Sequence, residues 1–179
     1  SNSLGSQDGS APFEASAKGI YLDGGVSHMT VKGNTVINTS EGIQLKGDFE
    51  TISNNNIFNA RNSALNFSSI VGEFYQNVDY IIPNNNVVTY NNFFNSAGAY
   101  PSVDLYSGFG NDFDLAQRAI FDYNIYFQPY YEFFAIQGRS GSPRSYYIFP
   151  EWQSLKSQDL NSKYISSFYE IRHYKVTSY

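Results

Sequence analysis

The chain has 179 residues, of which 41% are hydrophobic and 15% are charged, so it is long enough and apolar enough for one domain with a sizeable core. Its formal net charge of −5 argues against nucleic acid as a partner, because phosphate binding needs clustered Lys and Arg. No run approaches the roughly 20 apolar residues of a membrane helix, and the absence of cysteine excludes a disulfide framework and a Cys-based metal site.

Residues 1–18 are small and polar and are predicted to form an extended lead-in. Nothing before Gly19 resembles an amphipathic cap helix, although the open end of a repeat protein exposes apolar residues and unpaired strand edges. We therefore expect the N-terminal edge of the domain to be covered by upstream coils of the same gene product or by a second protein chain.

Residues 19–58 contain the clearest repeat. Gly-Ile-Tyr-Leu-Asp at residues 19–23 is followed by Gly-Ile-Gln-Leu-Lys at residues 42–46, and the apolar residues of 31–36 are matched by those of 52–57. The repeat length is about 22 residues, and each unit holds two short segments of alternating apolar and polar residues separated by Gly, Asn, Asp and Ser. Such a unit cannot bury its own inner face, so it is stable only when stacked on its neighbours. The pattern predicts a parallel β-helix, because the Leu-x-x-Leu-x-Leu signature of leucine-rich repeats is missing.

Two columns of inward residues extend the repeat. The first column consists of Leu22, Leu45, Phe67, Leu105 and Ile136. The second pairs Val31 with Val36, Ile52 with Ile57, Val88 with Phe93, and Ile120 with Ile125. The spacing between successive members increases at the same places in both columns. This locates two long loops on one side of the solenoid, the side that often binds ligands in repeat proteins. A short helix is predicted over residues 112–119 in the second of these loops.

Asparagines recur at the corners of the repeat. One row is predicted to contain Asn34, Asn55 and Asn91, and the next row Asn56, Asn92 and Asn124. Stacked amides hydrogen-bond along a solenoid axis, so a structural role is predicted for both rows.

The coils are predicted to occupy residues 19–137, and residues 138–179 to close the solenoid with a loop, a short helix and a strand. The helix is predicted over residues 150–156, where Pro150 stands at its start and apolar residues recur three apart. The last strand is predicted over residues 169–176.

The repeated Gly-Ile-x-Leu and Ile-x-Asn-Asn-Asn-Ile-Phe segments, with Glu-Trp-Gln at 151–153 and Gln-Asp-Leu-Asn-Ser at 158–162, resemble the right-handed parallel β-helix proteins of carbohydrate metabolism. The resemblance covers residues 19–168. It implies an all-β solenoid of about four to five coils and a secreted or cell-surface bacterial protein. It does not choose among polysaccharide lyases, glycoside hydrolases, uronan epimerases and phage tailspikes, which share this fold.

Asp23 and Lys46 follow equivalent strands and should lie about 5 Å apart on stacked coils, where the long loops depart. They are the candidate catalytic residues, because hydrolases of this fold use strand-end carboxylates and lyases use Lys or Arg as the base. Lys46 occupies the place where a hydrolase would need its second acid. Two other interpretations remain open: a surface ion pair between coils, and a calcium site that includes Asp48. No other cofactor is predicted.

Further residues around this pair are candidate substrate-binding groups. They are Tyr21, His28, Glu41, Asp48 and Tyr106. Flat tyrosine rings stack on sugar faces, and Tyr75, Tyr80, Tyr100 and Phe109 also fall in or near the long loops. The sequence therefore supports two hypotheses. The first is a hydrolase or lyase that processes a polysaccharide or oligosaccharide along one face of the solenoid. The second is a non-catalytic glycan-binding or structural segment of a larger surface protein.

Overall fold

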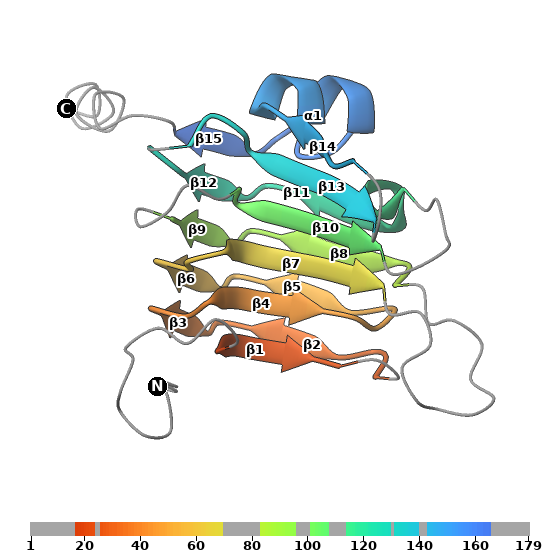
Figure 1. Ribbon diagram of the computed structural model, residues 1–179. Helices are drawn as coiled ribbons and strands as arrows, with labels where there is room; N and C mark the ends of the chain where they lie inside the picture. Colours follow the sequence, from red (N-terminus) through yellow and green to blue (C-terminus); the bar gives the residue numbers. More distant parts are fainter. Residues whose placement is uncertain are drawn as a thin grey trace.

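The computed structural model describes residues 17–23, 26–69, 83–95, 101–107, 114–129, 131–139 and 143–165. Most of the regular structure in these ranges is β-strand. The strands form three sheets, and within each sheet they lie one above another along the length of the domain (Figure 1). The predicted all-β class with parallel sheets is confirmed. The predicted division at residues 18 and 137 stays a prediction, as does the strand over residues 169–176, which lies outside the described residues.

The first sheet contains, in spatial order, β1 (Lys18–Leu22), β4 (Glu41–Leu45), β7 (Ser63–Ser69), β10 (Val103–Ser107), β13 (Ala135–Arg139) and β14 (Ser145–Tyr147). The second contains β2 (Thr30–Lys32), β5 (Thr51–Ser53), β8 (Asn86–Thr89) and β11 (Ala119–Asp122). The third contains β3 (Thr35–Ile37), β6 (Asn56–Phe58), β9 (Asn92–Phe94), β12 (Ile125–Phe127) and β15 (Lys163–Ile165).

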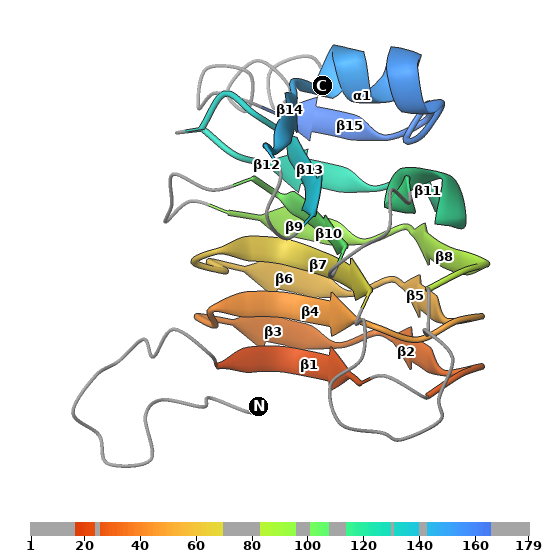
Figure 2. The same cartoon turned by 45° about the vertical axis from the view of Figure 1, so that its right-hand side comes forward.

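The chain visits the three sheets in turn, so each of the first four circuits, here called coils, adds one strand to each sheet (Figure 2). The last circuit adds β13 and β14 to the first sheet and β15 to the third. Strands pair in parallel between successive coils, and β14, which pairs antiparallel with β13, is the exception among the described strands. Equivalent residues of successive coils therefore lie about 4.8 Å apart, and the hydrophobic core runs along the axis of the stack.

The first predicted column is confirmed through four coils. Leu22 pairs with Leu45, Leu45 with Phe67, and Phe67 with Leu105. The next partner of Leu105 is Gln137 and not Ile136, so the last member of the column was predicted one residue too early. Side chains alternate across a strand, and a shift of one residue exchanges the inner and outer faces.

The second predicted column is correct for its first three pairs and wrong for the last. Val88 is followed in the stack by Phe121, and Phe93 by Tyr126. Phe121 and Tyr126 are buried, whereas Ile120 is 61% exposed. Aromatic side chains replace aliphatic ones at the inner positions of this coil, and the aliphatic residue beside each of them was mistaken for the core residue.

A ladder of asparagine side chains connects the coils. The backbone N–H of Asn34 donates to Oδ1 of Asn55 (2.9 Å), that of Asn55 to Oδ1 of Asn91 (3.0 Å), and that of Asn91 to Oδ1 of Asn124 (2.9 Å). Asn124 thus belongs to the first asparagine row, and its predicted place in the second row was wrong. The second row is Asn56 and Asn92, whose amides hydrogen-bond at 2.8 Å.

The residue before each ladder asparagine turns the chain from the second sheet to the third. These residues have φ angles of 70° at Gly33, 55° at Asn54, 58° at Tyr90 and 57° at Tyr123. The left-handed region is unusual for a bulky residue, and the exposed rings of Tyr90 and Tyr123 stack on each other with centroids 4.9 Å apart. The ladder amides hold this corner by hydrogen-bonding to backbone groups of neighbouring coils.

Two helices lie at the later coils. The 3-10 helix η1 (Leu115–Arg118) falls within the range predicted for a short helix, and α1 (Phe149–Lys156) confirms the predicted helix near the C-terminus. Trp152 of α1 is fully buried against Phe121 and Phe134, so α1 packs on the aromatic end of the core.

Replacing Asn91 by alanine is expected to lower the free energy of unfolding by about 2 kcal/mol, because the backbone N–H of Asn55 and the side-chain amide of Asn55 lose their acceptor inside the protein. Asn161 makes an exposed side-chain contact with Asp122 at 2.8 Å and serves as the matched control. Urea unfolding of both variants tests this, and equal losses for Asn91→Ala and Asn161→Ala would show that the ladder does not stabilise the stack.

Candidate functional site

The outer face of the first sheet carries a continuous row of polar side chains. Tyr21 pairs with Gln44, Gln44 with Asn66, and Asn66 with Asp104, on β1, β4, β7 and β10. Their neighbours Leu22, Leu45, Phe67 and Leu105 point into the core. Strand alternation therefore places the polar row on the outside of the sheet.

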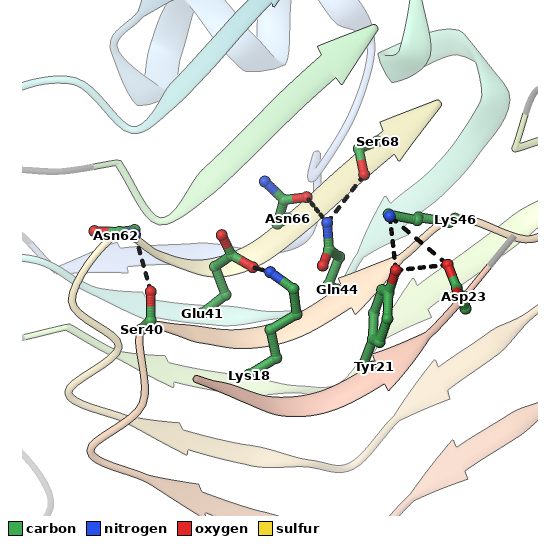
Figure 3. Close-up of polar contacts among 10 residues, drawn as sticks. All are labelled: Lys18, Tyr21, Asp23, Ser40, Glu41, Gln44, Lys46, Asn62, Asn66 and Ser68. Carbon is green, nitrogen blue, oxygen red and sulfur yellow. Dashed lines mark hydrogen bonds and ion pairs between the residues drawn. The ribbon is translucent and has the colours of Figure 1, made fainter. Parts of the chain in front are cut away.

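Lys46, Tyr21 and Asp23 form a compact group at one end of this face (Figure 3). Lys46 Nζ donates to Tyr21 Oη at 2.7 Å, and the Tyr21 hydroxyl donates to Asp23 Oδ1 at 2.5 Å. The distance from Lys46 Nζ to Asp23 Oδ1 is 3.7 Å, and the ammonium lies 4.9 Å from the centre of the Tyr21 ring. The structure thus brings together three residues that the sequence predicted to be neighbours.

The two charges of this group differ in exposure. The Lys46 side chain is 16% exposed, whereas that of Asp23 is 61% exposed. An ion pair with one such exposed partner is worth less than about 1 kcal/mol. The ion pair therefore stabilises the fold little. The Asp23 carboxylate and the Tyr21 ring are exposed to a ligand, whereas the Lys46 side chain is mostly covered.

Glu41 lies on the same face, paired with Lys18. The Lys18 Nζ to Glu41 Oε2 distance is 2.5 Å, and the two side chains are 24% and 14% exposed. Glu41 is therefore an ion-paired carboxylate at the beginning of β4, whereas Lys46 follows the end of the same strand.

Between these two ion pairs lies a cluster of buried amides and a hydroxyl. Gln44 Nε2 donates to Asn66 Oδ1 at 3.1 Å and to Ser68 Oγ at 3.2 Å (Figure 3). All three residues are less than a tenth exposed. Gln44 Oε1 is buried and accepts no hydrogen bond from the described residues.

Asp104 continues the row on β10. Burial raises the pKa of its carboxyl, Arg144 acts in the opposite direction, and Glu41 adds to the rise. Arg144 Nη1 lies 3.9 Å from Asp104 Oδ2, and Oδ1 has no hydrogen-bond partner among the described residues. Arg144 also lies over the ring of Tyr106, 5.7 Å from its centre. Tyr106 is next to Ser68 in the register, so this predicted substrate-binding residue lies on the same face.

His28 and Asp48 lie on the connections that lead from the first sheet to the second. The backbone N–H of His28 donates to the carbonyl oxygen of Asp48 (3.2 Å), and the His28 ring stacks on Phe49 at 4.9 Å. These two predicted binding residues therefore neighbour each other at a corner rather than on the outer face. Glu50, which follows them, is fully buried.

Sequence reasoning found Tyr21, Asp23 and Lys46 but missed Gln44, Asn66, Asp104 and Arg144 as members of this face. The available signal was the alternation itself, because Gln44, Asn66 and Asp104 each directly precede a residue of the first core column. Tyr75, Tyr80, Tyr100 and Phe109, predicted to line the loops, lie outside the described residues.

Within the described ranges, no group of three or more His, Cys, Asp or Glu residues could hold a metal ion, so the calcium interpretation gains no support there. The helices of the same ranges include none that is long and apolar enough to cross a membrane. Comparison of the chain with models of protein families, with curated proteins and with solved structures gives no match.

Proposed function

We propose that the coils form a right-handed parallel β-helix and that the chain is a polysaccharide-processing protein, which binds its glycan along the outer face of the first sheet. The hand is supported by the path of the chain. In Figure 1 it crosses the front from left to right in β1, passes behind through β2 and β3, and returns one level higher in β4. Right-handed crossovers between parallel strands are also the general rule.

The observation that carries the glycan proposal is the polar row across four strands. Its acceptors include Gln44 Oε1 and Asp104 Oδ1, neither of which is satisfied by the described residues. Buried unpaired acceptors cost free energy, and a donor from a ligand recovers it where the ligand displaces the atoms that cover them. Sugar hydroxyls are such donors, and a chain of sugar units matches a row of side chains that repeats at the strand spacing. The rings of Tyr21 and Tyr106 add flat apolar surface on the same face.

For the reaction, we assign Asp23 and Lys46 as the catalytic pair, with Tyr21 between them. Lys46 can neutralise an acidic sugar or orient the phenol of Tyr21, and Asp23 can hold or accept a proton. These roles suit a lyase acting on an acidic glycan. Asp104, whose carboxyl pKa is raised by burial against the opposing effect of Arg144, would be the candidate acid for a hydrolase.

The alternative is a non-catalytic glycan-binding or structural β-helix segment of a larger surface protein. It is favoured by the high exposure of Asp23, since a reacting carboxylate is more often shielded from water.

Under either function we propose a secreted or cell-surface location. Upstream coils or a second chain would cover the edge strands β1, β2 and β3.

The Asp23→Asn variant is expected to lose at least a hundredfold in turnover of an acidic or xylan-type polysaccharide, while its melting temperature stays nearly unchanged. Reducing-end release and absorbance of unsaturated products distinguish hydrolysis from elimination. Asp48→Asn, at the corner outside the polar row, is the matched control and should retain turnover.

Turnover at the wild-type rate in Asp23→Asn would remove Asp23 from the reaction. Glycan binding to the wild-type protein without any turnover would support the binding segment instead. A large loss of stability in Asp23→Asn would show that the ion pair has a mainly structural role.

A further inference from the structure

A cavity of about 510 Å³ lies at the last coil, on elements other than the strands of the polar row. It is bounded by the connection that follows β12, by the beginning of α1, and by β15. Its lining includes Gln128, Tyr131, Glu132, Phe149, Pro150 and Tyr164. This volume is within the usual range for small-ligand sites, which combine apolar walls with a few oriented polar groups.

The walls of this cavity are held by contacts to the core. Tyr164 stacks on Phe149 with ring centroids 5.2 Å apart, and its hydroxyl donates to the carbonyl oxygen of Tyr131 at 3.3 Å. Gln128 is buried, and its Oε1 accepts a hydrogen bond from Ser102 at 2.5 Å. The lining is therefore largely preformed, which lowers the entropy lost on binding.

The charges around the cavity restrict the ligand. Among the described lining residues, Glu132 is the only Asp, Glu, Lys, Arg or His, and it is exposed. An anionic ligand would meet this carboxylate with no Lys, Arg or His among the described lining residues to offset it. A cationic ligand would be attracted by Glu132, and the positive end of the α1 helix dipole is already offset by Glu151 in the first turn. The charges of the described lining residues therefore disfavour an anion and leave a cation or a neutral ligand whose hydroxyl groups donate to Glu132.

We propose that this cavity binds one neutral pyranose residue, packed with its apolar face against the Tyr131 or Tyr164 ring and donating a hydroxyl hydrogen to the Glu132 carboxylate. The inference rests on the proposed glycan function and adds a second contact point for the same class of ligand. Binding at two points would raise the avidity of the protein for a long glycan chain without new contacts on the polar row.

The test uses the full chain labelled with ¹⁵N and a panel of neutral methyl pyranosides of the gluco, galacto, manno and xylo series. At least one sugar is expected to shift the amide signals of Tyr131 and Tyr164 saturably. Trp152, the only tryptophan, gives an independent fluorescence readout, because it contacts Phe134, which packs on both Phe149 and Tyr164. Sodium phosphate and choline chloride are the charged comparison probes and should bind at least tenfold more weakly.

Tyr131→Ala and Glu132→Ala should each raise the Kd of that sugar at least tenfold, whereas Tyr146→Ala, which removes an exposed ring outside the cavity, should not. Glu132 is exposed, so its variant tests the site even if Tyr131→Ala fails to fold. The inference is overturned if no sugar of the panel shifts these signals, if either charged probe binds as tightly, or if both variants bind like the wild type. Shifts of Gln44 and Asn66 signals by a longer oligosaccharide report the polar row separately, so failure at the cavity and failure of the proposed function are distinguishable.

Discussion

Replacing Asp159 by alanine is expected to lower the free energy of unfolding by about 4 kcal/mol. The Asp159 side chain is fully buried and accepts hydrogen bonds from Asn124, Tyr126, Trp152 and Ser162, at 2.6 to 3.2 Å. Removing it leaves the buried Tyr126 hydroxyl and Trp152 indole N–H without their acceptor, and each unsatisfied buried group costs about 1–3 kcal/mol. Asn124 keeps its hydrogen bond to the Val88 carbonyl oxygen, and Ser162 is half-buried, so these two donors lose less. Some of this cost is recovered because burial itself disfavours the carboxylate and raises its pKa.

The size of this effect follows from the position of Asp159 at the end of the asparagine ladder. Asn124, the last ladder residue, donates to Asp159 from its side chain, and Trp152 connects the same carboxylate to α1. Leu160→Ala is the control, because Leu160 is 63% exposed and its truncation should change stability by less than about 0.5 kcal/mol. Chemical denaturation of both variants measures the difference. A loss below about 1 kcal/mol for Asp159→Ala would contradict the view that this carboxylate fastens α1 to the coils.

The early coils could be predicted from the sequence because each is short and repeats its predecessor closely. Val31 and Val36 recur as Ile52 and Ile57 with nothing inserted between them, so the inner positions were assigned correctly. The register failed where Phe121 and Tyr126 replaced aliphatic core residues. Where a strand carries apolar residues on both of its faces, composition alone does not tell the inner face from the outer one.

The site was predictable at its charged end and not along its length. Asp23 and Lys46 are recognisable because charged residues directly follow two copies of the same apolar strand. Gln44 and Asn66 resemble ordinary solvent-facing residues of an amphipathic strand, and only the structure shows that they are buried and hydrogen-bonded. Arg144 reaches Asp104 from the connection between β13 and β14, a contact that the repeat pattern does not contain.

Replacing Glu50 by glutamine is expected to stabilise the protein above neutral pH and to have little effect at pH 4. Glu50 is fully buried, and neither of its carboxyl oxygens has a hydrogen-bond partner among the described residues. Burial, and secondarily the negative charge of Asp48, raises the pKa of Glu50 from 4.5 to about 7. The residue is tightly enclosed, because a Cβ on Gly47 would come within 2.5 Å of Glu50 Oε1.

The sign of the effect follows from proton binding. Between about pH 4.5 and 7 the folded protein holds a proton on Glu50 that the unfolded chain has released, so the free energy of unfolding falls as the pH rises through this window. Above the window the loss is complete and amounts to about 3 kcal/mol, since each pKa unit corresponds to about 1.4 kcal/mol. Glutamine has nearly the same shape and no charge, so the stability difference between Glu50→Gln and the wild type should grow from pH 4 to pH 8.

Urea unfolding of wild type and Glu50→Gln at several pH values between 4 and 8 measures this difference directly, because contributions from all other titrating groups cancel. Asp48→Asn is the matched variant. It removes the lesser cause of the raised pKa, so its stability should fall with pH less steeply than that of the wild type but more steeply than that of Glu50→Gln. Stability curves of wild type and Glu50→Gln that stay parallel over the whole range would mean that the Glu50 carboxyl ionises as it does in water. In that case solvent or a cation must reach it behind the Gly47 turn.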